Sequence, residues 1–279
     1  MVTVTTNIGF DDDATGLQTS SVGEPSVAAS TSTVFMTGNW YASRSSDRGA
    51  TWGVIDPFTE FPTDRGRFCC DQLVIYLPRQ RLWAWLLQYE QQGTSNIFRL
   101  AVSRTGASGS WRWWDIAPTD LNPSWTDAWF DYPDMAVSQG HLWVSFNQYD
   151  SNDTWRRAGI VRWPLAELAS ARPVTRRHWV TTSLGSLRLV QGAGTSMWFA
   201  GNTATSRSLH LFQWPDASDA VTKWQVKVGP WNDTDYTSST PGGGQWLSRL
   251  DDRITGGWRA GGHLGFLWSA GRATGRPHP

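Results

Sequence analysis

Carboxylate, arginine and tyrosine side chains gather in short stretches that lead into predicted β-strands. Asp131, Tyr132 and Asp134 share one stretch and are the catalytic candidates, because two carboxyl groups beside a phenol can supply the acid and the base of a glycosidic reaction. The residues predicted to bind a substrate are Arg67, Asp71, Gln72, Trp129, Arg188, Arg249 and Asp251. Arginine pairs with the carboxylate of an acidic sugar, so these stretches could also bind a glycan without cleaving it. In a third, structural interpretation the aspartates cap turns and pair with arginine.

The two cysteines of the chain, Cys69 and Cys70, are adjacent. Joined, they would form a vicinal disulfide directly before an inner strand, where a rigid apolar surface could support a sugar ring. Reduced, they would be ordinary buried thiols. A disulfide favours an oxidising compartment, so we expect an extracellular or periplasmic location, although the first 20 residues show no export signal.

No pattern of residues indicates a cofactor or a catalytic metal. The five histidines lack the spacing of metal ligands, and two adjacent cysteines are a poor zinc site. The aspartates at 11–13 and at 251–252 could hold a structural calcium ion, but they lack the alternating acidic positions of an EF-hand loop. We therefore expect no cofactor.

The strands that must position these side chains recur along the chain. Five pairs of strand-like runs, each joined by a tight turn, begin near residues 26, 73, 135, 187 and 253. After the first four pairs a third run follows at 41–44, 98–104, 159–163 and 209–214, and a fourth is marked by Trp52, Trp111, Trp179 and Trp224. Four strands in every 50 to 65 residues, roughly, are typical of a β-propeller blade.

The repeats predict an all-β chain, a β-propeller of about four and a half blades. Residues 1–279 would form a single propeller domain that is incomplete at its C-terminus, part of a six- or seven-bladed ring. In the alternative, the run Val2–Thr6 supplies an outer strand to the last blade and closes a small ring.

Composition excludes several classes of partner. Lys+Arg and Asp+Glu both number 24, so no net charge favours nucleic acid, and no apolar run is long enough for membrane insertion. The 20 tryptophans are expected mainly in blade cores, because both faces of a blade are buried. Four of them fall in predicted loops, where an exposed ring could stack on a sugar: Trp125, Trp129, Trp231 and Trp246.

One turn carries a more specific pattern. Ser45, Asp47, Gly49, Thr51 and Trp52 form an S-x-D-x-G-x-T-W octapeptide between the third and fourth strands of the first predicted blade. It resembles the Asp-box of the sialidase-like (BNR repeat) propellers, and residues 103–111 are similar to a degraded second copy. The resemblance implies a structural role for the five residues, away from the active site.

A resemblance to the sialidases themselves would further imply an arginine triad, a tyrosine nucleophile activated by glutamate, and an aspartate that acts as acid and base. The early Arg-Ile-Pro signature of these enzymes is absent, and Glu24-Pro25-Ser26-Val27 takes its place. The function expected from the sequence is glycan recognition at the central face, with glycoside hydrolase or polysaccharide lyase activity on an acidic glycan left open. The alternative is a non-catalytic propeller that binds protein partners.

Overall fold

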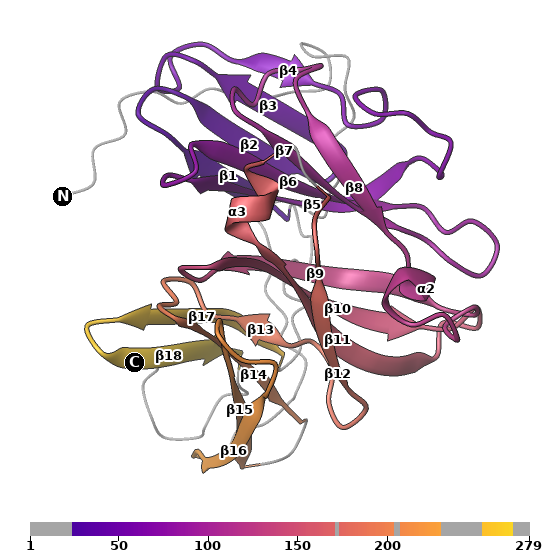
Figure 1. The fold of residues 1–279 in the computed structure, drawn as a ribbon, viewed down its shortest axis with the longest axis vertical. Coiled ribbons are helices and arrows are strands. Elements are labelled where there is room, and N and C mark those ends of the chain that lie inside the picture. Colours follow the sequence, from indigo (N-terminus) through magenta and orange to yellow (C-terminus); the bar gives the residue numbers. More distant parts are fainter. Residues whose placement is uncertain (1–23, 171–172, 204–206, 230–252, 270–279) are drawn as a thin grey trace, which may run out of the picture. The chain divides into compact units, whose positions relative to one another are not determined.

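The computed structural model describes residues 24–170, 173–203, 207–229 and 253–269. These residues form an all-β fold of four four-stranded sheets and one two-stranded sheet with antiparallel strands (Figure 1). In each sheet, spatial neighbours are also neighbours in the sequence. This meander is the blade unit of a β-propeller, so the prediction of four full units and part of a fifth is confirmed. The alternative prediction, in which residues 2–6 close a small ring, falls on a segment outside the described residues.

The bounds of the strands follow the predicted runs closely. Sheet 1 contains β1 (Ser26–Ala29), β2 (Val34–Gly38), β3 (Tyr41–Ser45) and β4 (Gly53–Ile55). Sheet 2 contains β5 (Phe68–Leu77), β6 (Leu82–Tyr89), β7 (Phe98–Ser103) and β8 (Arg112–Ile116). Sheet 3 contains β9 (Trp129–Val137), β10 (His141–Tyr149), β11 (Trp155–Pro164) and β12 (Arg177–Thr181).

The fourth sheet and the final hairpin complete the described strands. Sheet 4 contains β13 (Arg188–Leu189), β14 (Ser196–Asn202), β15 (Ser208–Pro215) and β16 (Thr222–Lys227), and the hairpin contains β17 (Ile254–Ala260) and β18 (His263–Trp268). The helices α2 (Pro118–Leu121) and α3 (Leu165–Leu168) have four residues each. No helix in the described part of the chain has both the length and the apolar character needed to cross a membrane.

Two strands begin earlier than the sequence predicts. β5 starts at Phe68 and β9 at Trp129, so Asp71 and Asp131 lie within strands and not in the loops before them. In β5 the register against β6 shifts between Phe68 and Gln72, which marks a bulge. Bulges re-aim side chains and are common beside active sites.

The chain divides into two compact units. Unit 1 comprises Met1–Met135, Gln148–Trp155 and Leu168–Arg172, and unit 2 comprises Ala136–Asn147, Arg156–Glu167 and Pro173–Pro279. The catalytic candidates, Cys69 and Cys70 all belong to unit 1, whereas Arg188 belongs to unit 2.

Aromatic side chains fill the core of unit 1. Trp85 is fully buried, and its ring lies 5.2 Å from Phe35 and 5.2 Å from Trp111 between ring centroids. Trp83 also packs on Phe35. Burial of large aromatic side chains on both faces of a sheet stabilises stacked blades, which explains much of the high tryptophan content.

In unit 2 the final hairpin packs on sheet 4. Ala200, Leu209 and Ile254 are buried there, with Phe266 and Trp268 against them. Gly257 lies so close to the backbone of Leu189 that a Cβ would come within 2.9 Å of its carbonyl oxygen. This contact positions β17 beside β13.

The octapeptide turn between β3 and β4 is held by its own side chains. Ser45 Oγ accepts a hydrogen bond from the Gly49 backbone N–H at 2.8 Å, and Asp47 accepts bonds from the backbone N–H and the hydroxyl of Thr51 at 2.9 and 2.6 Å. Trp52 Nε1 donates to the Gly49 carbonyl at 3.1 Å. Gly49 has φ +90°, a conformation that glycine adopts without strain.

Candidate functional site

Three carboxyl groups of unit 1, each in or beside a different sheet, act on one another electrostatically. Asp71 lies in the bulge of β5, Asp131 lies in β9, and Glu24 stands two residues before β1. Asp71 hydrogen-bonds to Glu24 through their side chains, and the negative charges of Glu24 and Asp131 both act on it. The tertiary structure thus joins residues that are far apart in the sequence.

Asp71 keeps its proton to an unusually high pH. Burial, the hydrogen bond with Glu24 and the charges of Glu24 and Asp131 together raise the pKa of Asp71 to about 8. Desolvation disfavours the ionised form, and two nearby negative charges do the same. At neutral pH Asp71 is therefore a protonated carboxyl that can donate its hydrogen, and this property is typical of a general acid.

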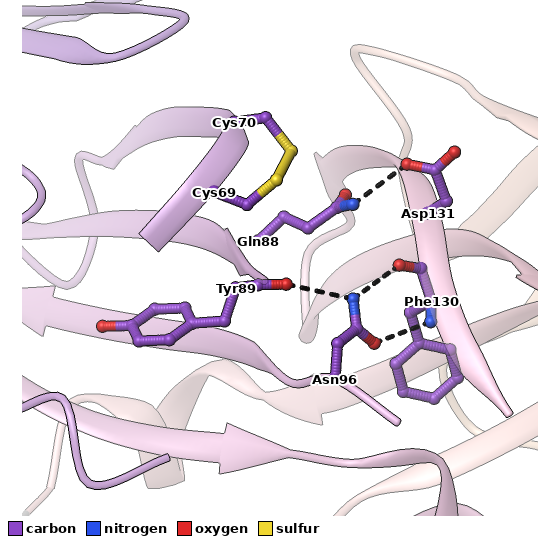
Figure 2. Close-up of a disulfide and its surroundings, with 7 residues drawn as sticks. All are labelled: Cys69, Cys70, Gln88, Tyr89, Asn96, Phe130 and Asp131. Carbon is purple, nitrogen blue, oxygen red and sulfur yellow. Dashed lines mark hydrogen bonds between the residues drawn. A yellow bond between two sulfur atoms is a disulfide. The ribbon is translucent and has the colours of Figure 1, made fainter. Parts of the chain in front are cut away.

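Asp131 is held by an amide from sheet 2. Gln88 Nε2 donates a hydrogen bond to Asp131 Oδ1 at 3.0 Å, and the Gln88 side chain is buried, with 3% exposed (Figure 2). Phe130, next to Asp131, forms two backbone hydrogen bonds with the buried Asn96 side chain. The Phe130 N–H donates to Asn96 Oδ1 at 2.7 Å, and Asn96 Nδ2 donates to the Phe130 carbonyl oxygen at 2.8 Å. Asn96 also donates to the Tyr89 carbonyl oxygen, so β9 is fixed to the end of β6 beside the site.

Cys69 and Cys70 are joined by a disulfide. It precedes Asp71 directly in the bulge of β5, and Figure 2 shows it with Gln88 and Asp131 in its surroundings. Both cysteines are only half-buried. Of the two states that the sequence allows, the structure therefore has the oxidised one.

The other two catalytic candidates lie beside Asp131. Tyr132 has φ +53°, in the left-handed region that a bulky residue rarely adopts, and such strain is concentrated at functional sites. Asp134 is buried, and its Oδ1 accepts a hydrogen bond from the Met135 N–H at 2.9 Å. Trp129 donates from Nε1 to the Asp150 carbonyl oxygen and stacks on Tyr149, so its ring is largely used for packing.

Gln72, predicted to bind substrate, uses its amide for contacts within the protein. Its side chain is 2% exposed, its Nε2 donates to the Gly38 and Tyr41 carbonyl oxygens at 2.6 and 2.8 Å, and its Oε1 accepts from Trp85 at 2.9 Å. The Gln72 amide therefore joins sheet 1 to sheet 2, and substrate binding by Gln72 stays a prediction.

The remaining binding candidates are dispersed. Arg67 is exposed just before β5, and its backbone N–H donates to Glu90. Arg188 lies in unit 2, where its Nε donates to the Ile254 carbonyl oxygen at 3.2 Å. Trp125, expected in an exposed loop, is buried in the core. Four candidates lie outside the described residues: Arg249, Asp251, Trp231 and Trp246.

Glu24 is the site residue that sequence reasoning did not select. The signal was its place two residues before β1, the first strand of sheet 1, as β5 and β9, which contain Asp71 and Asp131, are the first strands of their own sheets. In the described ranges no group of three His, Cys, Asp or Glu side chains has the arrangement needed to hold a metal ion.

The described residues form the blades of a β-propeller, and three of its sheets contribute the carboxyl groups Glu24, Asp71 and Asp131. No protein-family model matches the sequence, and no curated protein matches it.

Among solved structures, the chain is similar to the endo-arabinase from Bacteroides thetaiotaomicron at 10% identity, with 90% of this chain and 95% of that chain covered and a TM-score of 0.46. The GH43 endo-arabinanase from Bacillus licheniformis is similar at 12% identity, with 85% and 83% covered and a TM-score of 0.41. The catalytic domain of the Coprinopsis cinerea GH62 α-L-arabinofuranosidase is similar at 11% identity, with 78% and 71% covered and a TM-score of 0.43. The likeness is remote, so the function has to be argued from the side chains of the site.

Proposed function

We propose that this protein is a glycoside hydrolase whose general acid is Asp71. The observation that supports the proposal is the pKa of Asp71, which is raised to about 8 by burial and by Glu24 and Asp131. Glycosidic cleavage needs a carboxyl group that can donate a proton and a second carboxyl group beside it, and the raised pKa of Asp71 meets the first need.

The roles of the three carboxyl groups follow from their contacts. Asp71 gives its proton to the glycosidic oxygen, so that the leaving sugar departs as an alcohol while the bond to the anomeric carbon breaks. Asp131, oriented by Gln88, acts as the carboxylate partner, either taking a proton from the attacking water or bonding to the anomeric carbon itself. Glu24 accepts the hydrogen bond of Asp71 and keeps that proton in place.

The substrate class in this proposal is an acidic glycan. Arg67 is exposed four residues before Asp71, where a guanidinium can pair with the carboxylate of a uronic acid or a related sugar. The disulfide of Cys69 and Cys70 offers a half-buried apolar surface next to the carboxyl groups, and it supports an extracellular or periplasmic location.

We also assign the protein to the sialidase-like propellers within this proposal. The support is the octapeptide turn, in which Ser45 and Asp47 accept the hydrogen bonds that stabilise the link from β3 to β4. In the turn at 103–111, Ser103 Oγ likewise accepts the Thr105 and Gly106 N–H groups, so the second turn keeps the serine contact although it lacks the aspartate.

The test is a hydrolysis assay on a panel of acidic and neutral polysaccharides, with arabinan among the neutral ones, following new reducing ends and the absorbance of unsaturated products. We expect reducing ends without added absorbance. Asp71→Asn should then lower kcat by a factor of about 100 or more, which is what the loss of a general acid costs. Asp153→Asn, an exposed carboxyl of unit 1, is the matched control and should leave kcat unchanged.

Three results would overturn the proposal in different ways. Added absorbance would show a lyase. Retention on a glycan without any product would show a lectin-like protein. Full activity of Asp71→Asn would show that the acid is another group.

A further inference from the structure

Unit 2 carries a groove that is lined by its own residues. It has a volume of about 450 Å³ and lies along the turns that lead into β14 and join β17 to β18. Its lining comes from sheet 4, the final hairpin and one residue before β10, and it includes Gly194, Ser196, Trp198, Gln213 and Arg259. We call it the Trp198 groove.

An indole pair borders the groove. The Trp198 ring stacks on Trp224, with ring centroids 5.6 Å apart and planes at 26°. Trp224 is 40% exposed, and every residue of its strand β16 is exposed. β17 of the final hairpin packs on β13 and β14, at the other side of sheet 4 from β16. An open indole pair is a surface on which a sugar ring stacks.

Polar groups for a ligand stand beside the indoles. Gln213 pairs with Trp198 across β14 and β15, and its Nε2 donates to Ser196 Oγ at 3.0 Å. Within the described residues Gln213 Oε1 accepts no hydrogen bond, so it can accept one from a ligand hydroxyl. A flat apolar surface with an amide at its edge matches the alternating faces of a pyranose.

The charge of the groove comes from Arg259. Its Nη1 lies 2.9 Å from the position that a Cβ on Gly194 would occupy, so the guanidinium rests over the turn between β13 and β14. Within the described part of the chain this guanidinium has no hydrogen bond and no ion pair, and no carboxylate is among the described lining residues. An uncompensated guanidinium in a groove favours an anionic ligand.

We propose that the Trp198 groove is an auxiliary binding site for a carboxylated sugar unit of a glycan. The sugar ring stacks on Trp198, its carboxylate pairs with Arg259, and a hydroxyl donates to Gln213 Oε1. The site does not depend on the hydrolase activity of unit 1.

The experiment is calorimetric titration of the full chain carrying Asp71→Asn, so that no ligand is consumed. The probes are trigalacturonate and the neutral maltotriose, each at low and high salt. We expect saturable binding of trigalacturonate that weakens with salt. Arg259→Gln should lower the affinity for trigalacturonate about tenfold, which corresponds to the loss of one charge-assisted hydrogen bond. Trp198→Ala should lower this affinity at least as much.

Two control variants match the two changes. Lys227→Gln removes an exposed cation from β16 of the same sheet, and Trp113→Ala removes an indole of unit 1 with 38% exposed. Neither should change the affinity. Circular dichroism confirms that each variant is folded.

Some results would overturn the proposal. These are equal affinity for the two trisaccharides, a trigalacturonate titration in which Trp198→Ala and Arg259→Gln remove no binding site, or capture of a protein partner through the groove without any trisaccharide binding. Groove binding in a protein that hydrolyses no glycan would overturn the proposed function alone, so the two failures are distinguishable.

Discussion

At the scale of single residues, the most informative group is Asp71. Its folded-state pKa of about 8 lies above the ordinary 3.8, so the folded protein binds this proton more tightly than the unfolded chain does. The stability that Asp71 contributes is fully present below about pH 4 and is lost as the pH rises through about 8.

We therefore expect Asp71→Asn to raise the free energy of unfolding at pH 8 relative to the wild type, and to change it little at pH 4. Urea unfolding at the two pH values measures this difference. Asp153→Asn, which removes an exposed carboxyl, should show no such pH dependence. Parallel stability curves for the wild type and Asp71→Asn would show that the Asp71 carboxyl is not desolvated.

The same group sets the pH dependence of the proposed activity. As the pH rises through about 8, Asp71 loses the proton that it must donate, so kcat/KM should fall on the alkaline side with a midpoint near that pH. A pH profile of kcat/KM on the best substrate of the panel checks this. If Asp71→Glu keeps the alkaline fall of kcat/KM but shifts its midpoint pH, the assignment is supported. If Asp71→Asn shows the same alkaline fall of kcat/KM as the wild type, the assignment is contradicted.

Asp47 shows the opposite behaviour. Hydrogen bonds from the Thr51 hydroxyl, the Thr51 N–H and Ser45 lower the pKa of Asp47 to about 2. Its contribution to stability is present above about pH 4 and is lost as the pH falls through about 2. Asp47→Ala should thus lower the melting temperature at pH 7, with the exposed neighbour Arg48→Gln as the control. Differential scanning calorimetry measures both, and equal melting temperatures would show that the turn folds without this carboxylate.

At the scale of elements, sheet 2 is stabilised by a buried ion pair. Arg99 is 1% exposed, donates two hydrogen bonds to Asp115 at 2.7 and 2.8 Å, and donates a third to the Tyr89 hydroxyl at 2.7 Å. Its guanidinium also lies 4.6 Å from the centre of the Tyr89 ring. Through these contacts Arg99 of β7 links the side chains of Tyr89 in β6 and Asp115 in β8.

Arg99→Met removes one partner and leaves Asp115 without its ion pair, which costs about 3–5 kcal/mol for a buried pair. Chemical denaturation of Arg99→Met, Asp115→Asn and the double variant gives the coupling energy between them. A double variant that loses the sum of the two single losses would show that the pair is not coupled.

At the scale of the whole molecule, opposite charges balance. Lys+Arg and Asp+Glu are both 24, and the isoelectric point of the sequence is about 7.0. Self-repulsion is smallest near this pH, so solubility should pass through a minimum there. Precipitation by polyethylene glycol across pH 5 to 9 measures it, and a minimum displaced by more than about one pH unit would indicate that many carboxyl groups titrate far from their ordinary pKa values.

The sequence alone was enough to predict the sheets. The tight turns, the alternation of apolar residues and the fourfold recurrence of strands are local patterns, and they appear in the structure as sheets 1–4 and the hairpin of β17 and β18. The bulge of β5 and the early start of β9 escaped prediction, because they depend on pairing with β6 and with the residues around Asn96.

Only the tertiary structure decided which polar residues form a site. Asp71 and Asp131 were singled out from the sequence, but their meeting with Glu24 depends on three sheets whose contributions are far apart along the chain. Gln72 and Trp125 look like ligand-binding residues in the sequence and are buried in the structure, because hydrogen-bond partners and neighbours from other strands enclose them. Desolvation and charge–charge interactions act through space, so a pKa of about 8 at Asp71 cannot be derived from the order of the residues.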